Sequence, residues 1–523
     1  MLAAATPLAN WVVVLPVILS LVAGAALLML PGRTPYRAIL AMLAVVLVGA
    51  VDLTLLLRVL QSGPVSMTMG RWLPPFGISF TADAASAAFA LAAAFVTLVV
   101  LVYAEMDRAG VGHGSFHAFA LLLLAGVSGS FLTGDLFNLY VWFEVMLIAS
   151  FGLMILDGSP IALDGAVKYG FLNFIATTLF LAALGLLYGT VGTLNMADVL
   201  GAAAKANPAV MTSIAALFLL AFGIKAAAFP VNGWLPASYH TPGVAVSALL
   251  AGLLTKVGVY ALLRALVLLL PQSRDFLQLL LAAIAVATLL LAPLGAIAET
   301  NLRRAIGFFV IGGIGSALAG IALSGPLGVA GSVVYIANAM LTVSALYLVA
   351  GLVEKLTGQT DTRQMGGIYA ASSAVSVLFL LLVLSTAGVP PFLGFWPKLL
   401  LLQAGIANLP PAGGALTDFV DLAVAIALLV NALLTLIAGT RLWSHVFWRV
   451  GTEGAQSEQA VTQLIAMSRR ERLFGIGAAA GLTAVVFALG LWPQPLLAIG
   501  RTASASLLDP HAYISAVGLG GAP

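Results

Sequence analysis

Residues 221–264 read AFGIKAAAFPVNGWLPASYHTPGVAVSALLAGLLTKVGVYALLR. This apolar stretch places Lys225 and Lys256 inside two segments that are predicted to cross a membrane. A charged side chain at the centre of a bilayer costs at least about 2.5–3.5 kcal/mol, so each lysine needs a partner or a water path. Pro230 and Pro236 interrupt the helical run between the lysines, because proline removes an amide donor and clashes with the preceding turn. In hydrocarbon the freed backbone groups have to bond to protein or water, so the stretch predicts a water-lined ion path.

Composition predicts an all-α polytopic membrane protein. Of 523 residues, 62% are hydrophobic and 8% are charged, and the mean hydropathy is +1.12. Soluble domains do not have this composition, whereas helical proteins surrounded by a lipid bilayer do. The chain has no cysteine, which excludes disulfides, thiolate metal sites and iron–sulfur clusters held by this chain. A net charge of +3 gives no indication of a nucleic-acid partner, and no motif indicates a cofactor or a metal site.

Apolar runs long enough to span a bilayer, about 20 residues each, predict about fourteen transmembrane helices in one membrane domain that covers residues 1–523. The N-terminal run has no basic segment before it, so we expect no cleavable signal peptide. The runs lie near residues 8–30, 36–60, 80–104, 115–133, 136–156, 165–190, 209–228, 243–270, 275–297, 303–323, 327–352, 372–405, 419–445 and 472–497. Pro390 and Pro391 split the twelfth run. The longest polar connection joins Arg449 to Arg472.

Lysines and arginines predict the orientation, because cytoplasmic loops carry an excess of them. We expect a bacterial cytoplasmic membrane protein with both termini outside. The richer, cytoplasmic side carries Arg33, Arg37, Arg108, Arg303, Arg304, Lys355, Arg363, Arg449, Arg469, Arg470 and Arg472. The other side carries Arg71, Lys205, Arg274 and Arg501, with Arg58 and Arg264 at helix ends.

The two proline breaks predict an internal repeat. FPVNGWLP at residues 229–236 resembles PFLGFWP at residues 391–397, and Lys398 follows the second motif directly. Matching broken segments in two halves indicate a transporter built from inverted repeats. The breaks lie five predicted spans apart, and an odd separation means that the two units run in opposite directions. The predicted units cover about residues 115–270 and 275–445, with flanking helices in 8–104 and 472–497.

Glu144 lies well inside a predicted helix among apolar and aromatic residues. A carboxylate in that setting needs a cation nearby, and Lys225 is the expected partner. The pair is predicted to open when a proton arrives, so that Lys225 moves towards Lys256. The alternative is a static ion pair that only fixes helix packing, although buried ion pairs are poor stabilisers.

Four further residues are candidates for the ion path, and Asp135 has a simple explanation. Lys256 lies at the middle of its span, so we place it in an ion path, whereas Lys398 either joins that path or reaches the membrane surface. Lys168 near a helix start either contributes to the path or contacts lipid headgroups. His240, in the turn before a helix, is either a site of proton uptake or a hydrogen-bonded loop histidine. Asp135 begins a helix, where the helix dipole explains a carboxylate.

The motifs KAAAFPVNGWLPASYHTP and VSALLAGLLTKVGVYALLR resemble the signature of the proton-conducting antiporter-like subunits shared by respiratory complex I and Mrp multisubunit cation/proton antiporters. GDLFNLYVWFEVMLIASFGL and KYGFLNFIATTLFLAALGLLYGTVGTLNMADV are most similar to the D-type subunits of Mrp. The resemblance covers about residues 75–450. It implies fourteen helices, two inverted five-helix units and breaks in helices 7 and 12. It also implies a buried charged axis through Glu144, Lys225, Lys256 and Lys398.

The sequence departs from this family on the predicted helix 11. Many relatives carry a histidine there, whereas VVYIANAMLTVSALYLVAG places Asn338 at that position. Asn338 and Tyr335 form hydrogen bonds but do not readily hold a proton at neutral pH. We therefore expect water, Asn338, Thr342 and Ser344 to link Lys256 to Lys398.

Three functions remain open from the sequence. The first is the proton-translocating subunit of a Na⁺ or K⁺/proton antiporter that assembles with other subunits. The second is a proton-pumping subunit of a redox complex of the complex I or membrane-bound hydrogenase type. The third is a structural membrane subunit with vestigial charges. We expect no enzymatic activity in this chain itself, because no redox or nucleotide motif is present.

Overall fold

The structure, a computed structural model, describes residues 6–31, 36–72, 74, 76–107, 115–323, 325–407, 418–449 and 464–519. Arg33 and Arg108 lie outside the described residues, as do residues 450–463 of the predicted polar connection.

Helices account for nearly all of the described structure. The first half of the chain forms α1 (Leu15–Met29), α2 (Arg37–Ser62), α3 (Ala84–Ala104), α4 (Phe116–Leu132), α5 (Leu136–Met154), α6 (Pro160–Val191), α7 (Met196–Ala203), α8 (Pro208–Ala226), α9 (Trp234–Ser238), α10 (Val244–Leu249) and α11 (Thr255–Leu262). The second half forms α12 (Pro271–Phe276), α13 (Gln278–Ala298), α14 (Leu302–Ala322), α15 (Gly325–Thr357), α16 (Ile368–Ala371), α17 (Ser373–Ala387), α18 (Phe395–Ala407), α19 (Asp418–Trp443), α20 (Arg469–Glu471), α21 (Gly477–Leu491), α22 (Gln494–Leu508) and α23 (His511–Val517).

Short segments of other types join or interrupt these helices. The 3-10 turns are η1 (Leu8–Val13), η2 (Met69–Arg71), η3 (Glu105–Asp107) and η6 (Thr362–Gln364), and the π-helical turns are η4 (Leu250–Leu254), η5 (Leu263–Leu269), η7 (Ser444–Trp448) and η8 (Arg472–Ile476). Strands β1 (Val65–Thr68) and β2 (Ser79–Ala82) form one antiparallel hairpin.

The predicted all-α polytopic fold is confirmed. In the described ranges, eleven helices are long and apolar enough to cross a membrane, and α1, α4, α17 and α18 are shorter apolar helices. The count of fourteen spans stays a prediction, and two of the predicted runs include segments that are not part of their helix. The run at 80–104 begins as strand β2, and the run at 472–497 ends at Leu491 because the chain turns at Pro493 before α22 begins.

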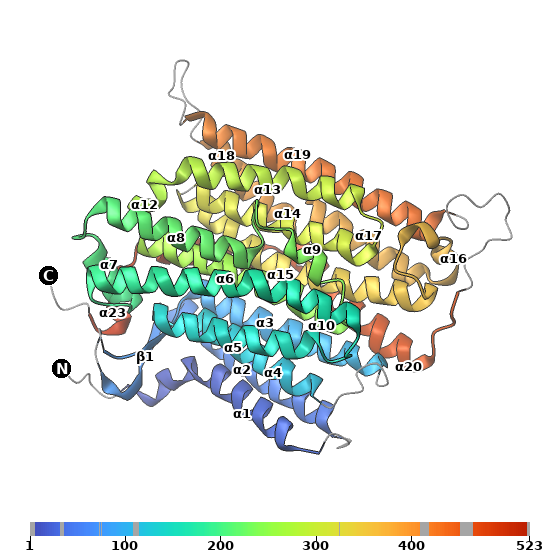
Figure 1. Ribbon diagram of the computed structural model, residues 1–523, viewed down its shortest axis with the longest axis horizontal. Coiled ribbons are helices and arrows are strands. Elements are labelled where there is room, and N and C mark those ends of the chain that lie inside the picture. Colours follow the sequence, from blue (N-terminus) through green and yellow to red (C-terminus); the bar gives the residue numbers. More distant parts are fainter. Residues whose placement is uncertain are drawn as a thin grey trace.

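Helix α15 runs through the middle of the molecule (Figure 1). Helices α18 and α19 lie along one edge of the picture, and α1 lies along the opposite edge. Residues 244–269 and α15 are the spans whose apolar windows are entirely buried among the described helices. These two segments therefore form the core around which the other helices pack.

The two breaks have the same local backbone geometry. Helix α8 ends before Ala227, which has a φ of 60°, and the amide of Ala228 donates to Gly223 over 2.9 Å. Helix α17 ends before Gly388, which has a φ of 87°, and the amide of Val389 donates to the carbonyl of Leu384 over 3.0 Å. A cis proline follows in both, at Phe229-Pro230 and at Pro390-Pro391. The sequence prediction of two matching breaks is thus confirmed in the backbone.

A second pair of matching features supports the repeat. An isolated antiparallel bridge joins Asp135 to Asn195, and another joins Asn301 to Asp361. Figure 1 shows α7, which follows Asn195, and α16, which follows Asp361, at opposite ends of the helices. This placement agrees with inverted units. The limits 115–270 and 275–445 stay predictions.

Charged residues of the predicted cytoplasmic side gather at one end of the helices. Lys355 pairs with Glu471 over 3.0 Å, and Arg470 pairs with Glu105 over 3.1 Å. At the other end, η1 and α23, the first and last described elements, both pack on strand β1. The two ends of the described chain therefore lie on the same side of the molecule.

Candidate functional site

Lys225 lies in the last turn of α8 and is 6% exposed. Its Nζ lies 5.3 Å from the centroid of the Phe143 ring on α5. A cation over an aromatic face is attracted by the negative face of the ring. The lysine is thus held against the residue next to Glu144.

Glu144 does not close an ion pair with Lys225. Among the described residues, no hydrogen bond or ion pair to Glu144 is found, and its side chain is only partly buried. It belongs to a stripe of α5 that faces outward, with Phe137 46%, Val141 39% and Ile148 67% exposed. The predicted partners are neighbours on facing helices, and their coupling stays a prediction.

Lys256 is buried between two π-helical turns. Its Nζ donates to the carbonyl of Ala251 over 2.6 Å, and its side chain is 1% exposed. Ala251 belongs to η4, the π-helical turn that directly precedes the helix carrying Lys256. Single π-turns inside α-helices occur often at functional sites. In the described part of the chain no carboxylate pairs with Lys256, so main-chain oxygen solvates its amine.

Lys398 lies at the second break and is also bonded to main-chain oxygen. Its Nζ donates to the carbonyls of Thr386 over 3.1 Å and Ala387 over 2.8 Å. These are the last carbonyls of α17, where the helix dipole and free carbonyl groups favour a cation. Lys398 is 5% exposed, so the alternative in which it reaches the membrane surface does not describe this structure.

Polar side chains of α15 lie close to the two segments that carry the buried lysines. Asn338 accepts a hydrogen bond from Thr342 over 3.0 Å, and its Nδ2 would lie 3.6 Å from a Cβ atom built at Gly394 in the second break. Ser344 donates to Ala248 over 3.2 Å, on the segment that carries Lys256. One helix therefore contacts the surroundings of both lysines.

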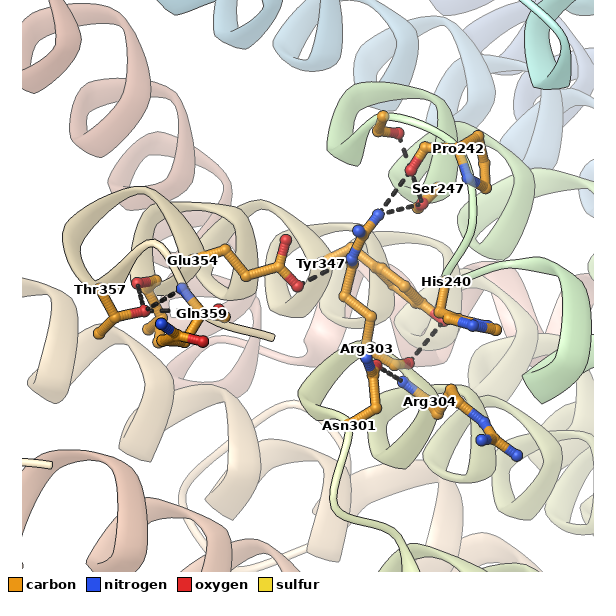
Figure 2. Close-up of polar contacts among 12 residues, drawn as sticks. His240, Pro242, Ser247, Asn301, Arg303, Arg304, Tyr347, Glu354, Thr357 and Gln359 are labelled. Carbon is orange, nitrogen blue, oxygen red and sulfur yellow. Dashed lines mark hydrogen bonds and ion pairs between the residues drawn. The ribbon is translucent and has the colours of Figure 1, made fainter. Parts of the chain in front are cut away.

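His240 belongs to a polar cluster at the N-terminal end of α14, which Figure 2 shows. Its Nδ1 lies 2.8 Å from the carbonyl oxygen of Pro236. Burial, helped by the positive charges of Arg304, Arg303 and Lys168, lowers the pKa of His240 to about 4, although the hydrogen bond to the Pro236 carbonyl opposes this shift. The imidazole is therefore neutral near pH 7, which favours the hydrogen-bonded loop histidine.

Arg303 in the same cluster joins the two predicted units (Figure 2). Its Nε donates to Glu354 of α15 over 2.9 Å, and its Nη1 donates to the carbonyl of Pro242 over 2.6 Å. A cavity of about 360 Å³ lies beside these groups and is also lined by Asp157 and Lys355. The sequence analysis missed Glu354, although a glutamate near the end of a long apolar helix was the signal available.

Two other candidates lie apart from the buried lysines. Lys168 is exposed on α6 and pairs with Asp164, one turn away, over 2.5 Å. Asp135 caps α5 by accepting a hydrogen bond from the amide of Asn138 over 2.8 Å, as the dipole argument expects. Burial raises the pKa of Asp135 to about 6, against the opposing effect of amide hydrogen bonds.

The sequence analysis also missed a buried ion pair. Arg264 Nη2 lies 2.6 Å from Asp83 Oδ2, and both side chains are 1% exposed. Asp83 stands at the boundary of an apolar run and lies far from its partner in the sequence, so no sequence pattern linked the two.

The buried amines, the polar side chains of α15 and the proline-broken helices define a class of protein: a helical membrane transporter with ionisable groups along its centre. A family profile described as NADH:quinone oxidoreductase/Mrp antiporter, TM, matches residues 133–418. The chain belongs to this family.

The similarity to individual proteins extends over nearly the full length of the chain. The chain is 33% identical over 510 residues to the D-type Na(+)/H(+) antiporter subunit of Alkalihalophilus pseudofirmus, covering 97% of this chain and 99% of that protein. It is 32% identical to the subunit of the same name in Bacillus subtilis, with the same coverage. A chain in the structure of the Mrp complex from Dietzia sp. DQ12-45-1b superposes with a TM-score of 0.85 at 30% identity and covers 98% of this chain and 99% of that one.

A further likeness points to respiratory complexes. A chain of respiratory complex I from Thermus thermophilus superposes with a TM-score of 0.78 at 25% identity, covering 95% of this chain and 100% of that one. The membrane arrangement is thus common to antiporter and redox assemblies.

Proposed function

We propose that this chain is the proton-translocating subunit of a multisubunit antiporter that exchanges Na⁺ or K⁺ for protons. The observation that carries the proposal is the placement of Lys256 and Lys398. Both amines are buried and bond to main-chain carbonyls, and polar groups of α15 contact the segment around each of them. The similarity to D-type chains of Na(+)/H(+) antiporters supplies the exchange reaction.

Each residue of the proposed path has a distinct role. Lys256 and Lys398 hold a proton as ammonium groups and release it as amines, because a desolvated lysine changes protonation readily. Asn338 orders water between them by hydrogen bonding, and Glu144 is the group that accepts an arriving proton. Protonation of Glu144 weakens its attraction for Lys225, which then moves towards Lys256.

Glu144 supports assembly with other subunits. A carboxylate on the outward stripe of α5 would face lipid in an isolated chain, which is costly at mid-membrane. We infer that a neighbouring membrane chain covers this stripe and supplies polar groups to Glu144. The names of the Mrp relatives, a complex and a subunit, support a multisubunit complex. Protons and Na⁺ or K⁺ are the transported ions that we propose.

We place the complex in a bacterial cytoplasmic membrane with both termini outside. Two observations support this orientation. The first and last described elements share one side of the molecule, and the ion pairs of Lys355 and Arg470 lie at the opposite, lysine- and arginine-rich end.

A proton-pumping subunit of a redox complex is the second candidate, favoured by the likeness to complex I. One experiment distinguishes the two. Everted vesicles carrying the complete set of subunits are energised, and the collapse of the pH gradient is followed after addition of Na⁺ or K⁺. An antiporter responds to the cation, whereas a redox pump responds only to its electron donor.

The variants Glu144→Ala, Lys225→Ala and Lys256→Ala test the path in the same vesicles. We expect each to lower exchange at least about tenfold, because each removes a group that holds charge in the bilayer. Lys205→Ala, at an exposed lysine before α8, is the matched control. Normal exchange in all three variants contradicts the path, and loss of exchange only together with assembly favours the static ion pair.

A further inference from the structure

The ion pair between Asp83 and Arg264 lies at the end of the helices that carries the β-hairpin. The guanidinium lies between two aromatic rings, 5.0 Å from the centroid of Tyr260 and 5.5 Å from that of Tyr513. Arg264 Nη1 is buried and makes no hydrogen bond to the described residues. A buried ion pair is a weak stabiliser, so its presence calls for a reason other than stability.

On the inner side, the pair connects to Lys256 along one helical face. Lys256, Tyr260 and Arg264 follow at intervals of four residues, which places them one above another. The hydroxyl of Tyr260 accepts a hydrogen bond from Arg264 Nε over 2.8 Å and donates to the carbonyl of Phe131 over 2.6 Å. Polar groups thus extend for two turns from the buried amine to the guanidinium.

On the outer side, strand β2 continues the polar groups. Ser79, Thr81 and Asp83 occupy alternate positions of extended backbone, so their side chains point to one side. Ser79 accepts a hydrogen bond from Asn195 over 2.8 Å, and the hydroxyls of Thr81 and Ser66 lie 2.9 Å apart. The side chains of all five residues, the three at alternate positions and their partners Asn195 and Ser66, are buried. Such a row in the wall of a membrane protein can order water or pass a proton between hydroxyl groups.

We propose that the Asp83–Arg264 pair is a selectivity barrier on the proton route, which lets protons leave Lys256 towards the β-hairpin end and stops Na⁺ and K⁺. This proposal rests on the proposed function of Lys256. The guanidinium is permanently charged and repels metal cations in a dry site, as fixed arginines do in other pores. A metal cation would have to separate it from Asp83.

A proton passes by a different route. It leaves the ammonium group of Lys256 through water or the Tyr260 hydroxyl and binds a carboxylate oxygen of Asp83, which becomes a neutral carboxylic acid. Asp83 then releases the proton to the hydroxyl row of β2 and returns to the carboxylate. Arg264 keeps its charge throughout, so the barrier to metal cations persists during proton transfer.

The test uses the complete complex in proteoliposomes, with passive ²²Na⁺ uptake measured without a pH gradient and exchange measured with one. The double variant Asp83→Asn/Arg264→Gln removes both charges and leaves no unpaired ion. We expect it to raise passive Na⁺ uptake at least about tenfold, because the fixed charge is gone. Asp83→Asn alone keeps the arginine, so we expect exchange to fall about tenfold without a leak.

Two controls separate the possible results. Arg274→Gln removes an arginine of another arginine–aspartate pair, whose Asp275 is exposed, and should match the wild type in both measurements. Lys256→Ala reports on the proposed function alone: normal exchange there refutes the route itself, whatever the other variants do.

The proposal is overturned if passive Na⁺ uptake in the double variant and exchange in Asp83→Asn both equal those of the wild type. Loss of assembly in both variants also overturns it, because the pair would then serve folding only. A leak in the double variant with unchanged exchange in Arg274→Gln supports the barrier.

Discussion

The Nζ of Lys398 lies 2.8 Å from the carbonyl oxygen of Ala387, at the end of α17. The helix end thus supplies both a hydrogen-bond acceptor and a favourable dipole for the ammonium group. Gly388 makes this approach possible, because a Cβ atom there would lie 2.7 Å from Lys398 Cδ. The broken helix therefore positions the amine through its main chain.

Replacing Gly388 tests this positioning. In Gly388→Ala, the added methyl group pushes the Lys398 stem away from the α17 carbonyls, and the φ of 87° adds backbone strain of about 1–2 kcal/mol. We expect exchange to fall several-fold in everted vesicles. Gly367→Ala is the matched control, because Gly367 has a φ of 68° and no atom within 4 Å of the added Cβ. Equal exchange in the two variants, corrected for assembly, would show that the Lys398 contact is not needed.

Asn338 is the second position to test. In Asn338→Leu, the acceptor for Thr342 is lost and an apolar side chain excludes water, so we expect exchange to fall at least about tenfold. Asn338→His offers a group that holds a proton near neutral pH, and exchange should stay within a few-fold of normal. Asn431→Leu, which removes a buried asparagine between α13 and α19, controls for the loss of a buried amide. Unimpaired exchange in both Asn338 variants would place the proton route elsewhere.

His240 gives a prediction about pH. Its pKa of about 4 lies below the value of about 6.5 for an unperturbed histidine, so the folded state binds fewer protons than the unfolded state between these values. Stability should therefore fall as the pH drops through this window.

His240→Gln removes that contribution. We expect the melting temperature of the purified complex to fall less between pH 7 and pH 5 in this variant than in the wild type, because no imidazole titrates at this position. Exchange near pH 7 should be unchanged, because the imidazole is already neutral there. His511→Gln, at an exposed histidine of α23, should behave as the wild type. Loss of exchange in His240→Gln near pH 7 would restore the role in proton uptake.

The sequence predicted the breaks and the buried lysines because the signals are local. A proline inside an apolar run interrupts a helix wherever that helix packs, and a lysine at mid-span has few ways to reach water. In the structure, Pro230 and Pro391 lie between helices and Lys256 and Lys398 are buried, whereas the role of these lysines in a proton path stays a prediction. The two bridges that mark the repeat involve single residues without a distinctive motif. In the sequence, the repeat was therefore visible only in the pattern of the proline breaks.

The partners of the charges could not be predicted in the same way. Whether Glu144 contacts Lys225 depends on the rotation of α5 about its axis, and the structure turns that glutamate to the outer stripe. The pairing of Asp83 with Arg264 depends on how a hairpin and a helix far apart in sequence come together. Helices α22 and α23 were missed because they are short, and α22 mixes polar with apolar residues.

Helix α15 contacts both halves of the chain, and this has a consequence for any attempt to express the two halves separately. Asn338 and Ser344 lie six positions apart, about 240° around a helix of 3.6 residues per turn. Asn338 faces the second break, and Ser344 contacts the segment of Lys256 in the first half. If the gene were split between the two repeats, the first product would lack the wall that Ser344 provides to its own lysine segment. The two halves share the same break geometry, yet neither is a self-sufficient module, and a single substitution in α15 affects both.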